Sequence, residues 1–176
     1  MKLWALLLFA VVSPLGFAAG TALPAVAHVD LARYSGTWYE IARYPNWFER
    51  DCASDVTAQY SMRSDGKVTV RNACHKANGK IKVSNGTAKI VDTTSNAKLK
   101  VTFFWPFSGD FWIIDLAPDY DYAVVGEPSR KYLWILSRSA QLTPETYDRI
   151  STRLRELSYD PAKLVKTRQA STPIAH

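Results

Sequence analysis

The sequence predicts an all-β fold, an eight-stranded antiparallel up-and-down barrel (a calyx) with one C-terminal α-helix packed outside it. Three observations lead to this prediction. Short runs of alternating apolar and polar residues recur along the chain, turn-forming pairs such as Asp65-Gly66 separate them, and one stretch near the end has helical spacing. Eight consecutive strands joined by tight turns have exposed edges, and closure into a barrel removes those edges.

The first residues are predicted to be a secretory signal that precedes the barrel. The start of the chain has one basic residue and then an apolar run too short to span a bilayer, followed by small residues suited to cleavage. We place this signal at residues 1–22, with its end between 18 and 27. Because the first cysteine is Cys52, we expect no lipoprotein anchor. The mature chain is expected to be exported, periplasmic or secreted, and soluble.

Composition and charge bound the domain count and the partners. A chain of 176 residues with 47% hydrophobic and 22% charged positions suits one compact domain, which we place at residues 31–169, before a flexible tail at 170–176. The formal net charge of +6 becomes +5 without Lys2, and the basic residues are mostly scattered among acidic ones. We therefore expect no nucleic-acid partner, and either a monomer or a homodimer.

The strands are read in order from the alternation. The first is residues 36–44, and "DVTAQYSM" (55–62) is a half-buried strand that Asp65-Gly66 turns into a hairpin with residues 67–74. The remaining strands are predicted at 80–91, 97–104, 110–117, 122–127 and 131–138, with turns at Asn78-Gly79, Thr94-Ser95-Asn96, Ser108-Gly109-Asp110, Pro118-Asp119 and Pro128-Ser129.

A single helix follows the strands. Thr143 can cap it and Pro144 fits its first position. Apolar residues then recur at spacings of three and four on one face, which is an ordinary docking surface. Residues 163–169 are predicted to form a short ninth strand. The apolar residues of the helix face are Tyr147, Ile150, Leu154 and Leu157.

Small residues on the inward faces favour a cavity over a packed core. An eight-stranded barrel has an interior that side chains can fill or that can hold one small ligand. Alanines stand where a packed core more often has leucine or phenylalanine, although a filled core is the alternative. These residues are Ala58, Ala88, Ala97 and Ala123.

Three segments resemble the lipocalin family. They are "GTWYEIA" (36–42), "PDYDYAVVG" (118–126) and "YLWILSR" (132–138), in the family's order and separation. With residues 96–107 between them, the chain is most similar to the bacterial lipocalins that group with apolipoprotein D. The resemblance implies a carrier of a small hydrophobic ligand, a fatty acid or lysophospholipid, with a role in lipid transport or envelope maintenance.

The topology places the three segments at one end of the barrel. Trp38 can close that end, with the Arg138 guanidinium across its ring, next to Gly36; we expect all three to be structural. In an oxidising compartment, Cys52 and Cys74 can form one disulfide, and two separate thiols are the alternative.

The opposite, open end is predicted to gather aromatic residues. Trp47, Phe48, Trp105 and Phe107 lie in its loops. Apolar side chains at a rim can guide a ligand or make transient membrane contact, or they can pack on one another as a lid. Basic residues near this mouth could meet an anionic head group, or serve as ordinary surface charge. They are Arg43, Arg50, Arg130 and Lys131.

Alternation also predicts the residues that line the cavity. Trp112 and Trp134 match calyx-lining positions of the family. Glu40 shares the inward phase of Trp38, and because a buried ion is costly, we expect the strand to bend there; a protonated or paired Glu40 is the alternative. The predicted lining is Val56, Ala58, Tyr60, Val70, Asn72, Ala88, Leu99, Val101, Phe103, Trp112, Ile114, Ala123, Val125, Tyr132 and Trp134.

Catalysis, metals and cofactors are not expected. The three histidines, His28, His75 and His176, cannot supply a histidine metal cluster, and no Gly-x-Ser-x-Gly or phosphate-binding glycine loop occurs. Some lipocalin relatives act on lipids through a pocket cysteine, which a disulfide would prevent here. A bilin or haem carrier shares the fold and is the alternative to a lipid carrier.

Overall fold

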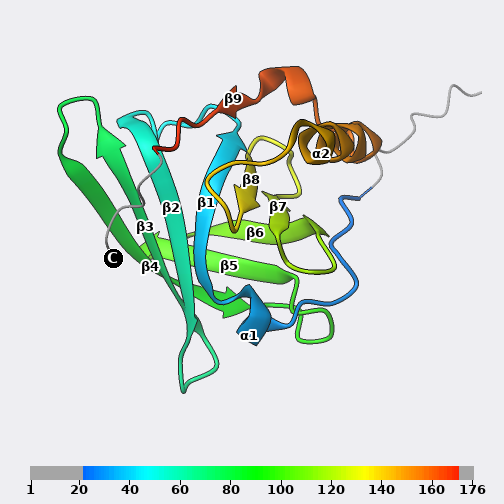
Figure 1. Cartoon of the computed structure of the whole chain (residues 1–176). Coiled ribbons are helices and arrows are strands. Elements are labelled where there is room, and N and C mark those ends of the chain that lie inside the picture. The colour runs from blue at the N-terminus through cyan, green and yellow to red at the C-terminus, as the bar shows by residue number, and fades with distance from the viewer. Residues whose placement is uncertain (1–21, 171–176) are drawn as a thin grey trace, which may run out of the picture.

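The chain forms a closed antiparallel barrel, which a computed structural model describes over residues 22–170 (Figure 1). The sheet order is β2-β3-β4-β5-β6-β7-β8-β1-β9, and β1 also pairs with β2, which closes the barrel. The predicted fold class is confirmed. The signal at 1–22 and the tail at 170–176 lie outside the described residues, apart from Ala22 and Ala170. The elements are α1 (Leu31–Tyr34), β1 (Gly36–Arg43), β2 (Cys52–Met62), β3 (Val68–Lys76), β4 (Ile81–Ile90), β5 (Lys98–Phe104), β6 (Phe107–Leu116), β7 (Tyr122–Gly126), β8 (Leu133–Ser137), α2 (Pro144–Glu156), a 3-10 turn (Pro161–Lys163) and β9 (Val165–Lys166).

One predicted turn is wrong. The residues Ser108-Gly109-Asp110 belong to β6, and the hairpin between β5 and β6 turns at Trp105 and Pro106. Gly109 pairs with Val101, and the register shifts between Val101 and Phe104. Because the ladder continues past Gly109, the hairpin extends further than the Ser-Gly-Asp turn signal indicates.

Trp38 closes one end of the barrel, as predicted. Its side chain is fully buried, and its indole Nε1 donates to the Tyr34 carbonyl oxygen at 2.8 Å. The Arg138 guanidinium carbon lies 3.8 Å from the centre of the Trp38 ring, and its nitrogens donate to three carbonyl oxygens within residues 33–37. Gly36 adopts φ +100°, a conformation that favours glycine. We call Trp38, Arg138 and Gly36 the floor.

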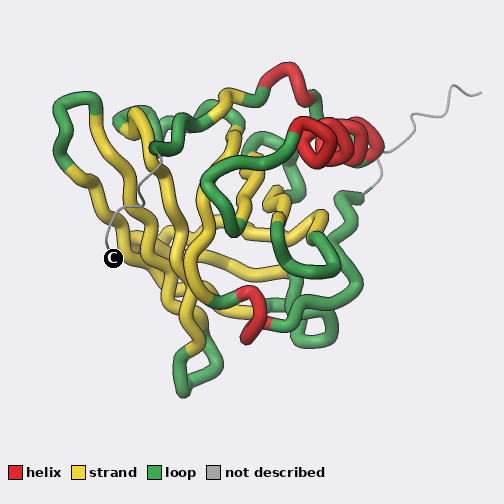
Figure 2. Tube along the Cα trace, viewed as in Figure 1, coloured by secondary structure: helices red, strands yellow, loops and turns green. Residues whose placement is uncertain are grey.

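Helix α2 lies outside the barrel, against β7 and β8 (Figure 2). Thr143 is its N-cap, accepting from Thr146 N at 3.3 Å, and Pro144 is its first residue. Its apolar face therefore buries the outward side chains of two strands, and those strands are apolar on both faces. The buried residues at this contact include Val124, Leu133, Ile135, Ile150, Leu154 and Leu157.

The seam between β1 and β2 is closed in two parts. The two strands pair directly only next to the floor, through four residue pairs. Beyond it, residues 165–170, which we call the C-terminal strap, lie between them: β9 pairs with β1, and Asp55 N donates to Arg168 O at 2.8 Å. The Gln169 amide donates to main-chain oxygens of both strands, at 2.8 and 2.9 Å. The strap thus supplies the partners that β1 and β2 lack.

The floor generates a stability prediction. Replacing Arg138 with methionine removes the stacked guanidinium and its hydrogen bonds to carbonyl oxygens, so we expect a loss of about 2 kcal/mol in unfolding free energy. Urea denaturation measures it. The control is Arg155→Met on the exposed face of α2, which should change stability by less than about 0.5 kcal/mol. Equal losses in the two variants would contradict a structural role for Arg138.

Candidate ligand-binding site

Most of the predicted lining residues face the barrel interior. Asn72 pairs with Ala58 and so shares its face. Tyr132 stacks on Trp134, with ring centres 6.0 Å apart. Phe103 lies over Gly86, where an added Cβ would meet its ring at 2.8 Å. Val56 is buried next to an irregularity in β2. The remaining inward residues form the interior cluster or pack against it: Ala58, Tyr60, Val70, Ala88, Leu99, Val101, Ala123, Val125 and Trp134.

The inward orientation predicted for Trp112 and Ile114 is wrong. Trp112 pairs with Lys98, whose Nζ lies 4.5 Å from the indole ring, and Ile114 packs in the cluster under α2. Phe111 and Ile113 face inward instead. Residues 111–114 are all apolar because their outward side chains are also covered, in the cluster under α2. Alternation of apolar and polar residues therefore cannot show which of them face inward.

Side chains fill the half of the barrel next to the floor. The cavity there measures about 10 Å³, which is room for about one water molecule. The expectation that the inward alanines leave volume is therefore wrong for this half, because aromatic rings from α1, β1, β2 and β6 occupy the space beside them. The rings are those of Tyr34, Trp38, Tyr60 and Phe111, and the alanines are Ala58, Ala88, Ala97 and Ala123.

The half toward the open end, which we call the upper calyx, contains the inward side chains of Asn72, Phe103, Tyr132 and Trp134, and Val56 is buried next to it. Asn72, Tyr132 and Trp134 are half-buried, and 37% of Phe103 is exposed. The side-chain oxygen of Asn72 is buried without a hydrogen-bond partner among the described residues. The upper calyx therefore combines aromatic rings with a polar group still able to accept a hydrogen bond.

The mouth aromatics divide into two groups. Phe48 packs on Tyr132 and Trp134, with ring centres 5.6 and 6.1 Å apart, and so covers part of the upper calyx. In contrast, Trp105 is 89% and Phe107 78% exposed on the hairpin between β5 and β6. Trp47 touches Phe48 edge-on and is 71% exposed. Phe48 fits the lid alternative, and the other three are exposed at the rim.

A charged cluster that the sequence did not reveal lies at the upper calyx. Arg43 Nη1 is 2.7 Å from a Glu40 carboxylate oxygen, and its Nε is 2.9 Å from a Glu49 oxygen. The indole Nε1 of Trp134 donates to Glu49 at 3.1 Å, and Thr167 of the strap donates to Glu40. We call Glu40, Arg43 and Glu49 the carboxylate–arginine cluster.

Glu40 faces inward and is paired, so the expectation that the strand turns it away is wrong. It lies opposite Leu136 of the interior cluster and is 2% exposed. β1 does bulge, but between Glu40 and Ala42, so Glu40 keeps its inward position and Arg43 gains one. Burial raises the pKa of Glu40 to about 8, with the Glu49 charge adding to it and Arg43 and Thr167 opposing it.

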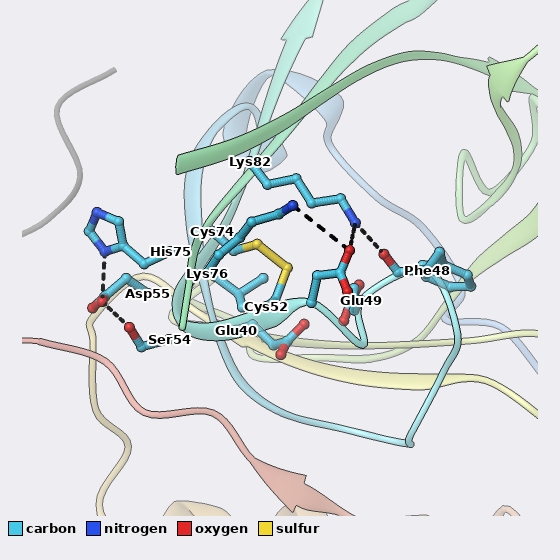
Figure 3. Close-up of a disulfide and its surroundings, with 12 residues drawn as sticks. Glu40, Phe48, Glu49, Cys52, Ser54, Asp55, Cys74, His75, Lys76 and Lys82 are labelled. Carbon is cyan, nitrogen blue, oxygen red and sulfur yellow. Dashed lines mark hydrogen bonds and ion pairs between the residues drawn. A yellow bond between two sulfur atoms is a disulfide. The ribbon is translucent and has the colours of Figure 1, made fainter. Parts of the chain in front are cut away.

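The disulfide between Cys52 and Cys74 ties β2 to β3 at the open end, as predicted. Figure 3 shows Lys82 beside it, directed at the Phe48 carbonyl oxygen, 2.8 Å away.

His75, on the same strand as Cys74, is directed at Asp55. The Ser54 hydroxyl donates to Asp55 and not to His75. In a hydrolytic triad the histidine accepts the proton of the serine hydroxyl. The His75 imidazole is not placed to do so here.

Asp55 anchors the end of the strap. Its carboxylate accepts from Ala170 N at 2.5 Å as well as from Ser54 and lies 3.0 Å from His75 Nδ1. Burial raises the pKa of Asp55, but these hydrogen bonds outweigh burial and lower the pKa below its ordinary value. A carboxylate held as an ion in this way keeps the strap attached over the neutral range.

The other basic residues predicted near the mouth lie outside the calyx. Arg50 and Lys131 are exposed, and Arg130 Nε donates to Leu157 O at 2.8 Å. Between residues 22 and 170, no group of histidine, cysteine and acidic residues is arranged to hold a metal ion. No helix in that same range is long and apolar enough to cross a membrane.

Comparison with known proteins gives family and fold. A family model described as a lipocalin-like domain matches residues 29–169. Temperature-induced lipocalin-1 of Arabidopsis thaliana is 42% identical over 84% of this chain and 83% of its own length. For outer membrane lipoprotein Blc of Escherichia coli (strain K12) the values are 39%, 82% and 81%. For apolipoprotein D of Macaca fascicularis they are 35%, 87% and 84%.

Solved structures share the barrel. Insecticyanin from the tobacco hornworm Manduca sexta superposes with a TM-score of 0.71 at 23% identity over 86% of each chain. Lobster apocrustacyanin A1 gives a TM-score of 0.66 at 18% identity, over 88% of this chain and 94% of its own. At these identities the likeness concerns the fold alone.

Glu40 should make stability depend on pH. Its pKa is higher in the folded chain, about 8, than the ordinary value of 4.5. The folded state thus holds a proton that the unfolded chain has released. We expect the stabilisation from Glu40 to be complete below its ordinary pKa and to fall by up to about 1.4 kcal/mol per pH unit as the pH rises toward the folded value.

Urea denaturation across this pH range measures the slope. Glu40→Gln should remove most of it, whereas Glu156→Gln on exposed α2 should leave it intact. A slope that is the same in wild type and Glu40→Gln would contradict the raised pKa.

Proposed function

Because this chain belongs to the lipocalin family, whose members bind small hydrophobic ligands, we propose that it carries a single-chain lipid, a fatty acid or a lysophospholipid. The acyl chain enters the upper calyx from the open end. The observation that carries the proposal is the half-buried, aromatic wall of Tyr132 and Trp134 beneath Phe48. Each methylene moved there from water contributes about 0.8 kcal/mol before ordering costs.

Entry of such a chain requires Phe48 to move. Phe48 covers the rings that an acyl chain would contact, and its loop carries the exposed Trp47 beside it. The filled floor half limits how deep the chain can reach, so the polar head stays near the mouth. The exposed rim residues suit transient contact with a membrane surface, from which the lipid is taken.

The proposed role is lipid transport or envelope maintenance by an exported, soluble protein. The disulfide supports an oxidising compartment. It also occupies both cysteines, which leaves no thiol for the cysteine chemistry of lipid-modifying relatives and supports a binding role. The test is native mass spectrometry of gently purified protein, in which we expect a bound lipid. An absorbance band at wavelengths above the aromatic region would favour the bilin or haem alternative.

Two tryptophans, Trp134 and Trp112, lie on opposite faces of the barrel wall. Trp134→Ala should weaken fatty-acid binding by about tenfold because it removes an inner ring, measured by displacement of a fluorescent fatty acid. Trp112→Ala, which removes an outer ring, should leave the affinity unchanged. Equal affinities in wild type and Trp134→Ala, with the fold retained in circular dichroism, would remove Trp134 from the binding site.

The exposed rim residues should control how fast lipid is taken up. Replacing Trp105 and Phe107 with serine should slow lipid uptake from vesicles several-fold without changing equilibrium affinity, because these exposed rings make the membrane contact. Stopped-flow fluorescence with labelled vesicles measures the rate. The matched control replaces Ile81 and Val83, which are exposed on β4, with serine. Transfer at wild-type rate in the rim variant would exclude the membrane-contact role.

A further inference from the structure

Arg43 differs from the other basic residues near the mouth because its guanidinium lies among the lining residues. It faces inward opposite Trp134, and its side chain is 13% exposed. Its contacts within residues 22–170 use Nε, toward Glu49, and Nη1, toward Glu40 and Thr167. These contacts leave Nη2 able to donate to a further acceptor.

We propose that Arg43 is the head-group site of the calyx and binds the carboxylate or phosphate of a single-chain lipid, which takes the place of Glu40 on the guanidinium. This inference rests on the proposed lipid-carrier function and names the class of lipid head. Glu40, protonated and therefore neutral, moves away from Arg43. It keeps its hydrogen bond with Thr167. The exchange needs one proton on Glu40 and breaks no covalent bond.

Charge balance favours this exchange over simple addition. Glu40 and Glu49 as ions on one guanidinium give the cluster a net charge of −1, and an anionic lipid head added to them would give −2 in a buried place. With Glu40 neutral, the cluster starts at zero, and the lipid head and Glu49 sharing Arg43 bring it only to −1. A protonated Glu40 therefore lets the cluster accept one anion at a net charge of −1 instead of −2.

Glu40 is the carboxylate that exchanges, because Glu49 has two side-chain donors besides Arg43 to hold it in place, whereas Glu40 has Thr167. Glu49 accepts from Trp134 Nε1 in addition to its contact with Arg43, and Asn46 donates to it at 3.3 Å. Burial, together with the Glu49 charge, raises the pKa of Glu40 to about 8. Glu40 is thus mostly neutral at neutral pH and becomes an ion in mildly alkaline solution.

Each element packed around Glu40 contributes one group that faces its carboxyl. β1 contributes Arg43, the loop between β1 and β2 contributes Glu49, and β2 contributes the Tyr60 hydroxyl. Burial and the nearby carboxylates raise the pKa of Tyr60 far above its usual value, so this hydroxyl stays neutral. The strap contributes uncharged Thr167, and β8 contributes apolar Leu136. Glu40 is therefore the group of this set that changes charge in this pH range.

The test compares lipids that differ only in the head. Dodecanoate, dodecyl phosphate and dodecanol displace the neutral probe N-phenylnaphthylamine from the full mature chain. We expect both anions to bind more tightly than dodecanol near pH 7. Between about pH 7 and about pH 9 the affinity for dodecanoate should fall by up to about tenfold, as Glu40 ionises, while that for dodecanol stays constant.

Variants separate the parts of the proposal. Glu40→Gln should bind dodecanoate equally well at both pH values, and Arg43→Gln should lose the preference for anions over dodecanol. The matched control is Arg50→Gln, since Arg50 is exposed, and it should behave as wild type. If Arg43→Gln does not fold, the pH response of wild type against Glu40→Gln decides.

The outcomes distinguish this inference from the function on which it rests. If all three lipids bind but dodecanoate and dodecanol respond alike to pH, or if folded Arg43→Gln keeps its preference for anions, the head-group site is overturned and the carrier proposal stands. If neither the probe nor any of the three lipids binds, both are overturned. A preference for dodecyl phosphate over dodecanoate would assign the site to phosphate heads, and the reverse to carboxylate heads.

Discussion

The structure depends on one constraint, which is that the main chain of β1 must find hydrogen-bond partners on both edges along its whole length. Near the floor these partners are β8 and β2, and farther along they are β8 and the C-terminal strap. The bulge after Glu40 marks the change from one arrangement to the other. Without the strap, the upper part of the seam would expose unpaired backbone to the calyx, which is costly in an apolar interior.

The bulge also explains why charges lie inside an otherwise apolar barrel. A regular strand that placed Glu40 inward would turn Arg43 outward, since side chains alternate. The extra residue brings Glu40 and Arg43 to the same face, where each satisfies the other, and Glu49 joins them from the following loop. The cluster is therefore a consequence of how the barrel is closed, and it lies where the packed half gives way to the upper calyx.

The sequence predicts correctly those features that depend on one or two identifiable residues. Trp38 and Arg138 meet as the topology predicts, the helix begins at Pro144, Cys52 and Cys74 are bonded, and the family resemblance of three short segments is confirmed. The errors arise where two faces of a strand are alike or where a partner comes from far along the chain. Trp112 lies in a run buried on both sides, so its phase was ambiguous.

Long-range contacts account for the other differences. The alanines indicated empty volume because the sequence does not show which rings come to lie beside them; Tyr34 arrives from α1 and Phe111 from β6. The pairing of Glu40 depends on a bulge and on Thr167, 127 residues away. A bulge inserts one residue into a ladder without a required residue type, so no pattern in "WYEIAR" marks it. Of the cluster, the sequence indicates only the cost of burying Glu40 and the place of Arg43 near the mouth.

The lid and the charged cluster are joined in one loop, and this connects ligand entry to head-group binding. Phe48 covers Tyr132 and Trp134, and the next residue, Glu49, holds Arg43 and the Trp134 indole. Lys82 donates to the Phe48 carbonyl oxygen, which fixes this stretch of backbone next to the ring that an acyl chain has to displace. The loop that carries the lid is thus tied to the cluster through Glu49, which keeps its contact with Arg43 when Glu40 gives way to the lipid head. The acyl chain, which enters first, is accommodated by the movement of Phe48. The charged head group, which follows, is bound by Arg43 beside Glu49.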